Sequence, residues 1–565
     1  MPILPPFALA LNLLQVSVDL LLEWFSQGVY ALLLPYAKDH PLVKVHDHFD
    51  LNPLEQACAG FHHGQGPGAP PTHPVPRLVR ALLVGYLFNW SLRDLEWHIR
   101  FNLVIKWFVG YAVYEPGPDH STLERFYQWV DAYQHRAYFD TVLRQIDADF
   151  PDQRRQAQVG DTFALRANAA KESLIRLIRH TCQRLLAAVA AADPEVQAAV
   201  RAQLDLNALF GATDEQREYQ LDAAGRTARL QTTVIAALAC ARQVRAALDL
   251  DAPAPLVPVA HPSVSLWLDC LDKVLADEVE ITRDAQGAIT AVAELPDGKQ
   301  GSYRLGSATD PDATYRVHGK DKVDFGYNIQ VTATQDFIRE IQADTGAQPD
   351  PVSIPEVLTA QHEHHGFFPP KLIYDKAAGT GKTHAEVERA TAGQTQLVAP
   401  LIDHTKSAER FTPEDFTLSP DGQSLTCPKG QTTTTAYRSR SGEGRNFRFP
   451  AGRCQGCKFC AKCRGDKVPA EHMRQVFISD HRSTAAQART YAQTPEFKAD
   501  MKLRPGIERI ISNLTNYHGA RRARRRGQDK ADFQAKMSGT VFNLRQWLRK
   551  LAARADQASP AAAGA

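Results

Sequence analysis

Strand-forming sequence is confined to a small part of this chain, and that limits the folds open to it. One strand pattern, at residues 158–165, stands alone; the others follow much later, at 280–282, 325–332, 337–341, 371–374 and 396–401. Gln335 and Asp336 supply a predicted hairpin turn. Most other stretches have apolar residues at helical spacing. The chain is therefore predicted to be an α/β protein whose first strand is separated from the rest by a helical insertion.

The remaining pattern divides the chain into further units. A length of 565 residues suits about three or four domains. We expect an N-terminal helical segment at 1–60, a linker at 61–74 and a helical domain at 75–150. An α/β core is expected at 155–401, with its helical insertion at about 170–260. A cysteine-rich insertion at 402–495, a second part of the core at 496–555 and a disordered tail at 556–565 complete the prediction.

The helical domain at 75–150 has local signals of its own. Leu78, Leu82 and Leu83 share one apolar stripe, and Ser91 with Asp94 three residues later predicts a capped helix start. Such a domain could bind DNA ends, or it could serve in dimerisation or support. The sequence leaves both readings open.

Several features point to a protein that stays in the cytoplasm. No apolar run approaches the roughly 18 residues that a membrane span needs, and no basic segment with a cleavage site opens the chain. Nine cysteines in such a chain are thiols or metal ligands rather than disulfides. Four of them, Cys58, Cys182, Cys240 and Cys270, are scattered and are expected in apolar cores.

The other five cysteines form a cluster. Cys454, Cys457, Cys460 and Cys463 follow one another at a spacing of three, with Cys427 upstream beside Pro428. Zinc prefers four tetrahedral thiolates, commonly from CxxC turns, so the cluster predicts a structural Zn²⁺ site. An iron–sulfur cluster or a set of unliganded thiols are the alternatives.

A basic segment lies near the C-terminus. Between Lys498 and Arg554 there are 15 Lys and Arg against 4 Asp and Glu, a net +11, while the whole chain carries only +2. Its densest part is a run of five arginines, Arg521, Arg522, Arg524, Arg525 and Arg526. Charge concentrated in this way attracts a polyanion, so nucleic acid is the predicted partner.

Three acids lie on three separate elements of the predicted α/β core. Asp161 lies in the first strand, Asp375 ends a later strand, and Glu508 lies in a helix before the arginine run. Carboxylates from separate elements can hold two Mg²⁺ ions about 3.5–4 Å apart for phosphodiester chemistry. Oxygen ligands suit this hard ion, and Mn²⁺ can replace it. The three acids are therefore the predicted catalytic and metal-binding residues.

With these residues in place, the chain resembles the DDE transposases of bacterial insertion sequences. The resemblance covers most of the chain from about Val75 to Leu551. Its most specific part is residues 504–508, Arg-Pro-Gly-Ile-Glu, followed by His518, Gly519 and the arginine run. Further matches are residues 160–163, Gly-Asp-Thr-Phe, and residues 325–328, Phe-Gly-Tyr-Asn. Relatives often have Tyr and Lys where this chain has Met501 and Thr515.

The resemblance implies an RNase H-like core and a specific activity. Asp161, Asp375 and Glu508 would be its catalytic acids, cutting at the element's ends and joining the freed 3′-hydroxyl to target DNA. Arg504 and the arginine run would hold DNA phosphates. A homodimer acting on double-stranded DNA at the bacterial nucleoid is implied as well. A metal-dependent nuclease without strand transfer and a non-catalytic DNA-binding protein are the alternatives.

Overall fold

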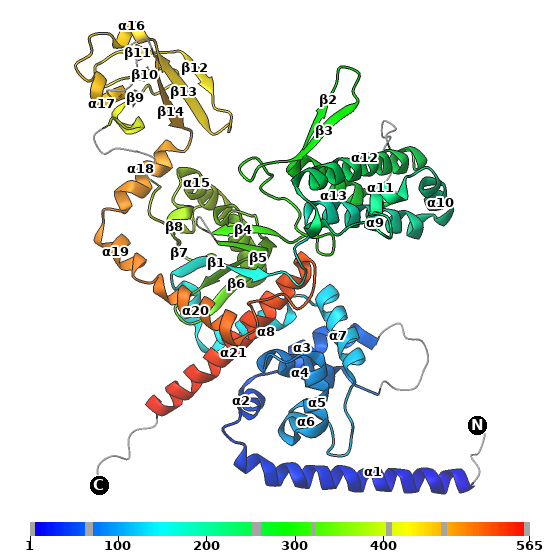
Figure 1. The fold of residues 1–565 in the computed structure, drawn as a ribbon. Coiled ribbons are helices and arrows are strands. Elements are labelled where there is room, and N and C mark those ends of the chain that lie inside the picture. The colour runs from blue at the N-terminus through cyan, green and yellow to red at the C-terminus, as the bar shows by residue number, and fades with distance from the viewer. Residues whose placement is uncertain are drawn as a thin grey trace.

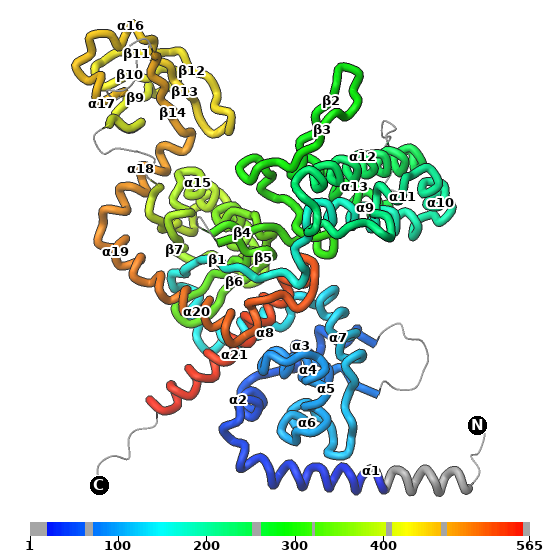
Figure 2. The backbone as a smooth tube through the Cα atoms, in the orientation of Figure 1, coloured from blue at the N-terminus to red at the C-terminus, as the bar shows by residue number. Residues whose placement is uncertain are grey.

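The computed structural model of the protein describes residues 6–62, 72–250, 261–318, 322–402, 410–464 and 472–558. In the first helix, side chains are described for Val18 and from Leu20 onward. Most of the expected linker at 61–74 and most of the expected tail at 556–565 lie outside these ranges. Figure 2 traces the backbone through all parts of the chain.

The N-terminal part is entirely helical. Its α-helices are α1 (Pro6–Leu33), α2 (Pro41–His48), α3 (Asn52–Ala57), α4 (Val75–Leu87), α5 (Leu92–Phe101), α6 (Leu103–Val109), α7 (His120–Tyr133) and α8 (Ala137–Asp149). The stripe of α4 is buried, and Ser91 and Asp94 form the predicted capping box of α5. Helix α1 extends along one side of this domain, away from the sheet (Figure 1).

The central sheet has six strands in a mixed arrangement. Its strands are β1 (Gln158–Arg166), β4 (Thr314–His318), β5 (Lys322–Ala333), β6 (Ile338–Thr345), β7 (Lys371–Ile373) and β8 (Gln396–Val398). β1 pairs antiparallel with β5 on one side and parallel with β7 on the other, and β5 also pairs with β4 and β6. The predicted α/β class is confirmed. Strand β4 was not predicted from the sequence.

Helices cover both faces of this sheet. Residues of α20 (Pro505–Tyr517) and α21 (Gln528–Ala558) share one apolar core with Phe163, Val331 and the N-terminal helices. Residues of α14 (Ile354–His365) and α15 (Gly381–Ala390) form a second core with Tyr374 and Leu397. The C-terminal helices thus pack between the sheet and the N-terminal domain (Figure 1).

The insertion after β1 is a separate packing unit with its own core. It comprises α9 (Leu174–Ala192), α10 (Pro194–Ala202), α11 (Leu206–Phe210), α12 (Ala223–Ala247), α13 (Pro262–Glu278) and the hairpin of β2 (Val279–Arg283) with β3 (Ile289–Glu294). The core reaches Leu305, so the unit extends past the expected end at about 260. The predicted strand at 280–282 exists, but it belongs to this hairpin and not to the central sheet.

The cysteine-rich stretch contains two small sheets that the sequence did not predict. One is made of β9 (Thr417–Leu418), β10 (Leu425–Thr426) and β11 (Thr432–Thr433); the other of β12 (Ala436–Arg438), β13 (Gly444–Phe449) and β14 (Arg474–Ser479). Short helices α16 (Ala451–Cys454) and α17 (Cys460–Arg464) lie between β13 and β14. We call residues 410–464 and 472–479 the cysteine module.

Helices α18 (Arg482–Tyr491) and α19 (Pro495–Met501) lead from this module back to α20 (Figure 1). Across the described ranges, no helix has both the length and the apolar character that crossing a membrane requires.

Candidate active site

Asp161 and Asp375 lie on neighbouring parallel strands. β1 and β7 pair at Val159 and Ile373, and each aspartate stands two residues further along its own chain. Asp375 keeps an extended backbone, with φ −78° and ψ −176°. Because side chains of extended chain alternate between faces, both carboxylates project from the face that also carries Val159 and Ile373.

The residues just before the two aspartates confirm this assignment of faces. A Cβ atom on Gly160 would lie 1.9 Å from the ring of Tyr374. The ring therefore occupies the opposite face, where its hydroxyl donates a hydrogen bond to Oε1 of Gln330 at 2.9 Å. Gly160 is needed because no side chain fits between the strand and this ring.

Helix α20 brings Glu508 toward the same region. Nη2 of Arg504, at the start of the helix, lies 3.5 Å from Oδ2 of Asp161. Glu508 stands four residues later and so lies on the same side of the helix as Arg504. Pro505 opens the helix and Gly519 follows its end with φ +73°. Glu508 is exposed and makes no hydrogen bond or ion pair with any described residue.

The electrostatic surroundings of Asp161 favour a bound cation. Burial raises the pKa of its carboxyl; the backbone N–H of Thr162 and the charge of Arg504 oppose that rise, and the nearby charges of Asp375 and Asp350 add to it. An added positive charge would relieve this repulsion. Oδ1 of Asp350 accepts a hydrogen bond from Asn328 at 2.9 Å. Asp350 was not predicted as a site residue from the sequence, because only the packing of β5 brings it near the site.

The donor set suits magnesium, but its side chains do not yet form a shell around an ion. Asp161, Asp375 and Glu508 offer only carboxylate oxygens, which Mg²⁺ prefers. Within the described part of the chain, no three His, Cys, Asp or Glu side chains are already placed to hold a metal ion. The backbone brings the three elements together, and closure of a metal shell would require side-chain rotation.

The arginine run is attached to the end of β1. The N–H of Arg166 donates to the carbonyl of Arg521 at 3.1 Å, and the N–H of Ala523 donates to the carbonyl of Arg166 at 2.7 Å. Five residues of strand separate Arg166 from Asp161, or about 16 Å at 3.3 Å per residue. The basic run therefore lies beside the end of the strand that carries the first predicted acid.

Two of the predicted DNA-binding arginines are half-buried against the N-terminal domain. Arg525 forms an ion pair with Glu124 of α7. Arg524 donates to Oδ1 of Asn89 at 2.7 Å and lies 4.6 Å from the ring centroid of Tyr86. That the whole run binds phosphates stays a prediction; for these two arginines it would require their contacts with the N-terminal domain to open.

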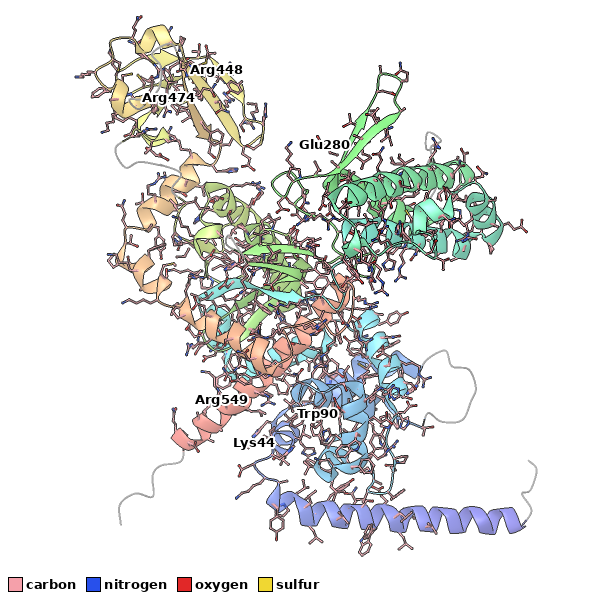
Figure 3. The ribbon with its side chains drawn as sticks, in the orientation of Figure 1. Lys44, Trp90, Glu280, Arg448, Arg474 and Arg549 are labelled. Atoms are coloured by element: carbon pink, nitrogen blue, oxygen red, sulfur yellow. The ribbon has the colours of Figure 1, made fainter. Side chains whose placement is uncertain are left out.

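The other three arginines of the run are exposed. Arg521 donates to Asn516 at 2.7 Å, and Nε of Arg526 donates to the carbonyl of Asn168 at 3.1 Å. Residues of the run and of α4 and α5 line a cavity of about 660 Å³, and Arg522 and Trp90 are among them (Trp90 is labelled in Figure 3). These contacts leave positive charge open to solvent.

The five clustered cysteines come together in the cysteine module. All of them are free and half-buried, and all line one cavity of about 30 Å³. The four scattered cysteines, Cys58, Cys182, Cys240 and Cys270, are buried in apolar cores as predicted.

Two family models match the chain. The model described as a transposase DDE domain matches residues 426–548, which include the five clustered cysteines, Glu508 and the arginine run. The model described as a transposase domain (DUF772) matches residues 33–129 in the N-terminal helical domain. No curated protein and no solved structure gives a match. The two matches confirm the resemblance to DDE transposases of insertion sequences and support a transposase function.

Proposed function

We propose that this chain, a DDE transposase of insertion sequences by both family matches, cuts double-stranded DNA at the element's ends and joins them to target DNA. The observation that carries the proposal is the strand register that brings Asp161 and Asp375 to one face, next to the helix that bears Glu508. The DDE match includes Glu508, whereas Asp161 and Asp375 lie outside both matched ranges.

The topology of the sheet supports an RNase H-like core. β5 and β6 form an antiparallel extension on one side of β1, and β7 and β8 run parallel to it on the other. Neighbouring parallel strands bring their carboxyl ends to one edge, where ligands of open α/β sheets bind. Asp375 stands at that edge, and the helical insertion and the cysteine module leave the sheet through its loops.

In this proposal Asp161, Asp375 and Glu508 hold Mg²⁺ or Mn²⁺. When bound, two such ions would activate the attacking oxygen and stabilise the leaving one. The chain's own part is to hold the carboxylates ionised and close together. Arg504 lowers the pKa of Asp161 against the effect of burial. Its positive charge also lies where a DNA phosphate would approach.

Three exposed arginines and the half-buried Arg504 are the proposed phosphate contacts. Arg504, Arg521, Arg522 and Arg526 would give affinity for DNA without reading its sequence. Arg524 and Arg525 would bind phosphates only if their contacts with the N-terminal domain were broken. That domain, over which the DUF772 match extends, would then recognise the ends of the element.

A homodimer is part of the same proposal, because two DNA ends must meet. Helix α1 offers a surface for it: Leu21, Trp24, Phe25 and Leu32 have 56–77% of their surface exposed. Val18, Leu21, Phe25 and Leu32 recur at spacings of three, four and seven, which suits pairing with a second helix of the same kind. The action would take place on DNA in the bacterial cytoplasm.

The proposal is tested by cleavage and joining of labelled DNA that carries the element's ends, with Mg²⁺ or Mn²⁺. Wild type is expected to cut and join, and Glu508→Gln to bind DNA but do neither. Glu496→Gln is the matched control, since Glu496 is an exposed glutamate on the preceding helix. Cutting without joining would indicate a nuclease. Binding without any cutting by wild type would indicate a DNA-binding protein and contradict the proposal.

A further inference from the structure

The cysteine module has very little apolar core to hold it together. Six side chains are buried in that core: Phe416, Leu425, Phe447, Phe449, Val476 and Ile478. Its strands are two to six residues long. Units with so small a core usually need a disulfide or a metal ion to stay folded. All five cysteines of the module are free thiols, so no disulfide supplies that support.

We propose that the cysteine module binds one structural Zn²⁺ in its thiol-lined cavity, through Cys427, Cys454, Cys457 and Cys463, and that Cys460 is not a ligand. The cavity of about 30 Å³ has room for a single ion. Four thiolates are a common shell for structural zinc.

Three of these four ligands are fixed by the module's core. Cys427, Cys454 and Cys463 pack against the buried apolar residues, so their backbone positions are held. Cys427 stands in a turn in which the N–H of Gly430 donates to its carbonyl at 2.7 Å. Gly430 has φ +84°, which closes a tight turn around the cysteine.

The fourth ligand comes from a second turn of this kind. Cys454 and Cys457 are joined by a backbone hydrogen bond of 3.2 Å, and Gly456 between them has φ +66°. A glycine in the left-handed region lets both thiols of a CxxC turn face one point. The turn from Cys457 to Cys460 has no glycine, and its Phe459 packs edge-on against Phe411 with ring centroids 5.7 Å apart. This favours Cys457 over Cys460.

The cavity is also lined by positive charge. Arg464 and Arg474 line the same cavity and would offset the net −2 of a zinc ion with four thiolates (Arg474 is labelled in Figure 3).

The thiols line the cavity without yet converging, since no three potential ligands in the described ranges form a shell. The position of each cysteine sulfur depends on a single side-chain torsion, χ1, and rotation about χ1 moves the sulfur between staggered positions. Binding therefore needs side-chain rotation within a backbone that is already in place.

The test is the metal content of the full chain, purified under reducing conditions without chelators. Elemental analysis should find about one zinc per chain in wild type and in Cys460→Ser, and almost none in Cys463→Ser. Circular dichroism and gel filtration of Cys463→Ser check that loss of metal is not loss of the whole fold. Should that variant aggregate, Co²⁺ titration of wild type and Cys460→Ser replaces it, with the same thiolate charge-transfer band expected in both.

Wild type without zinc and without a cobalt band would overturn the site. Bound iron with visible absorption would overturn zinc as the metal. Zinc lost from Cys460→Ser but kept in Cys463→Ser would overturn the choice of ligands. The result is independent of DNA cleavage, so it is distinguishable from success or failure of the proposed function.

Discussion

Arg525 and Glu124, which are 401 residues apart in the sequence, form a bidentate ion pair between the arginine run and helix α7. The guanidinium also lies 3.8 Å from the ring centroid of Tyr127, and both partners of the ion pair are half-buried. A cation held in this way is already neutralised. In the proposed function the run would therefore have two roles: Arg525 attaches the N-terminal domain to the core, and the exposed arginines bind DNA.

This division predicts different effects for two neighbouring arginines. Arg526→Ala should weaken DNA binding and reduce the slope of log affinity against log salt by about 1, because one phosphate contact is lost. Arg525→Ala should leave that slope unchanged and lower the free energy of unfolding by about 1–3 kcal/mol, since Glu124 loses its partner in a half-buried site. Fluorescence anisotropy at several salt concentrations and urea unfolding measure the two effects. An equal change of slope in both variants would contradict the division.

Arg504 should set the pH dependence of cleavage. Its charge lowers the pKa of Asp161, whose carboxylate must be ionised to hold a cation. In Arg504→Gln that pKa rises, so the acid side of the pH–rate profile should move to higher pH. Arg509→Gln, which changes an exposed arginine of the same helix, is the control and should leave the profile in place. A uniform drop in rate at every pH would show that Arg504 acts on substrate alone.

Helix α1 should be needed for the dimer. Phe25 is 56% exposed in the apolar row of this helix, so Phe25→Glu would place a charge in a helix–helix contact. Sedimentation analysis is expected to find a dimer for wild type and a monomer for the variant. Gln27→Glu adds the same charge at an exposed polar position and should remain dimeric. Wild type that sediments as a monomer would remove α1 from the proposal.

Local sequence predicted the elements better than it predicted their contacts. The capped helix start at Ser91 depends on neighbouring residues, and it was predicted from the sequence. The order of strands along the chain also gave the positions of Asp161 and Asp375. Whether the two lie on one face depends on register between strands more than 200 residues apart, which no local pattern encodes.

The strands and the arginine contacts that the sequence did not predict also have physical explanations. Strands β9 to β14 are short and contain polar residues, so their alternation is too brief to detect. β4 is a short strand whose identity depends on pairing with β5. Charge density marked the arginine run as one patch, but the sequence could not tell which arginines find a partner. That choice is made by the packing of α7 and α4 against the run.

His135 and Asp532 should make the stability of the protein depend on pH. Nε2 of His135 lies 2.7 Å from Oδ2 of Asp532, which links the N-terminal domain to α21. Burial alone would lower the pKa of His135, but hydrogen bonds to Asp131 and Asp532 raise it to about 9 from 6.5. Burial would raise the pKa of Asp532, but Lys536 and His135 lower it to about 2 from 3.8.

The direction in which stability changes with pH follows from whether the folded or the unfolded state binds the proton more tightly. The folded state holds the proton of His135 more strongly, so this stabilisation is complete below about pH 6.5 and is lost as pH rises toward 9. The folded state holds Asp532 ionised, so that stabilisation is present above about pH 4 and is lost as pH falls toward 2. Urea unfolding should find wild type about 2–3 kcal/mol less stable at pH 9 than at pH 6, at 1.36 kcal/mol per pKa unit. His135→Gln should lack that decline, and His46→Gln, at a half-exposed histidine, should retain it. A decline of equal size in His135→Gln would assign the pH dependence to other groups.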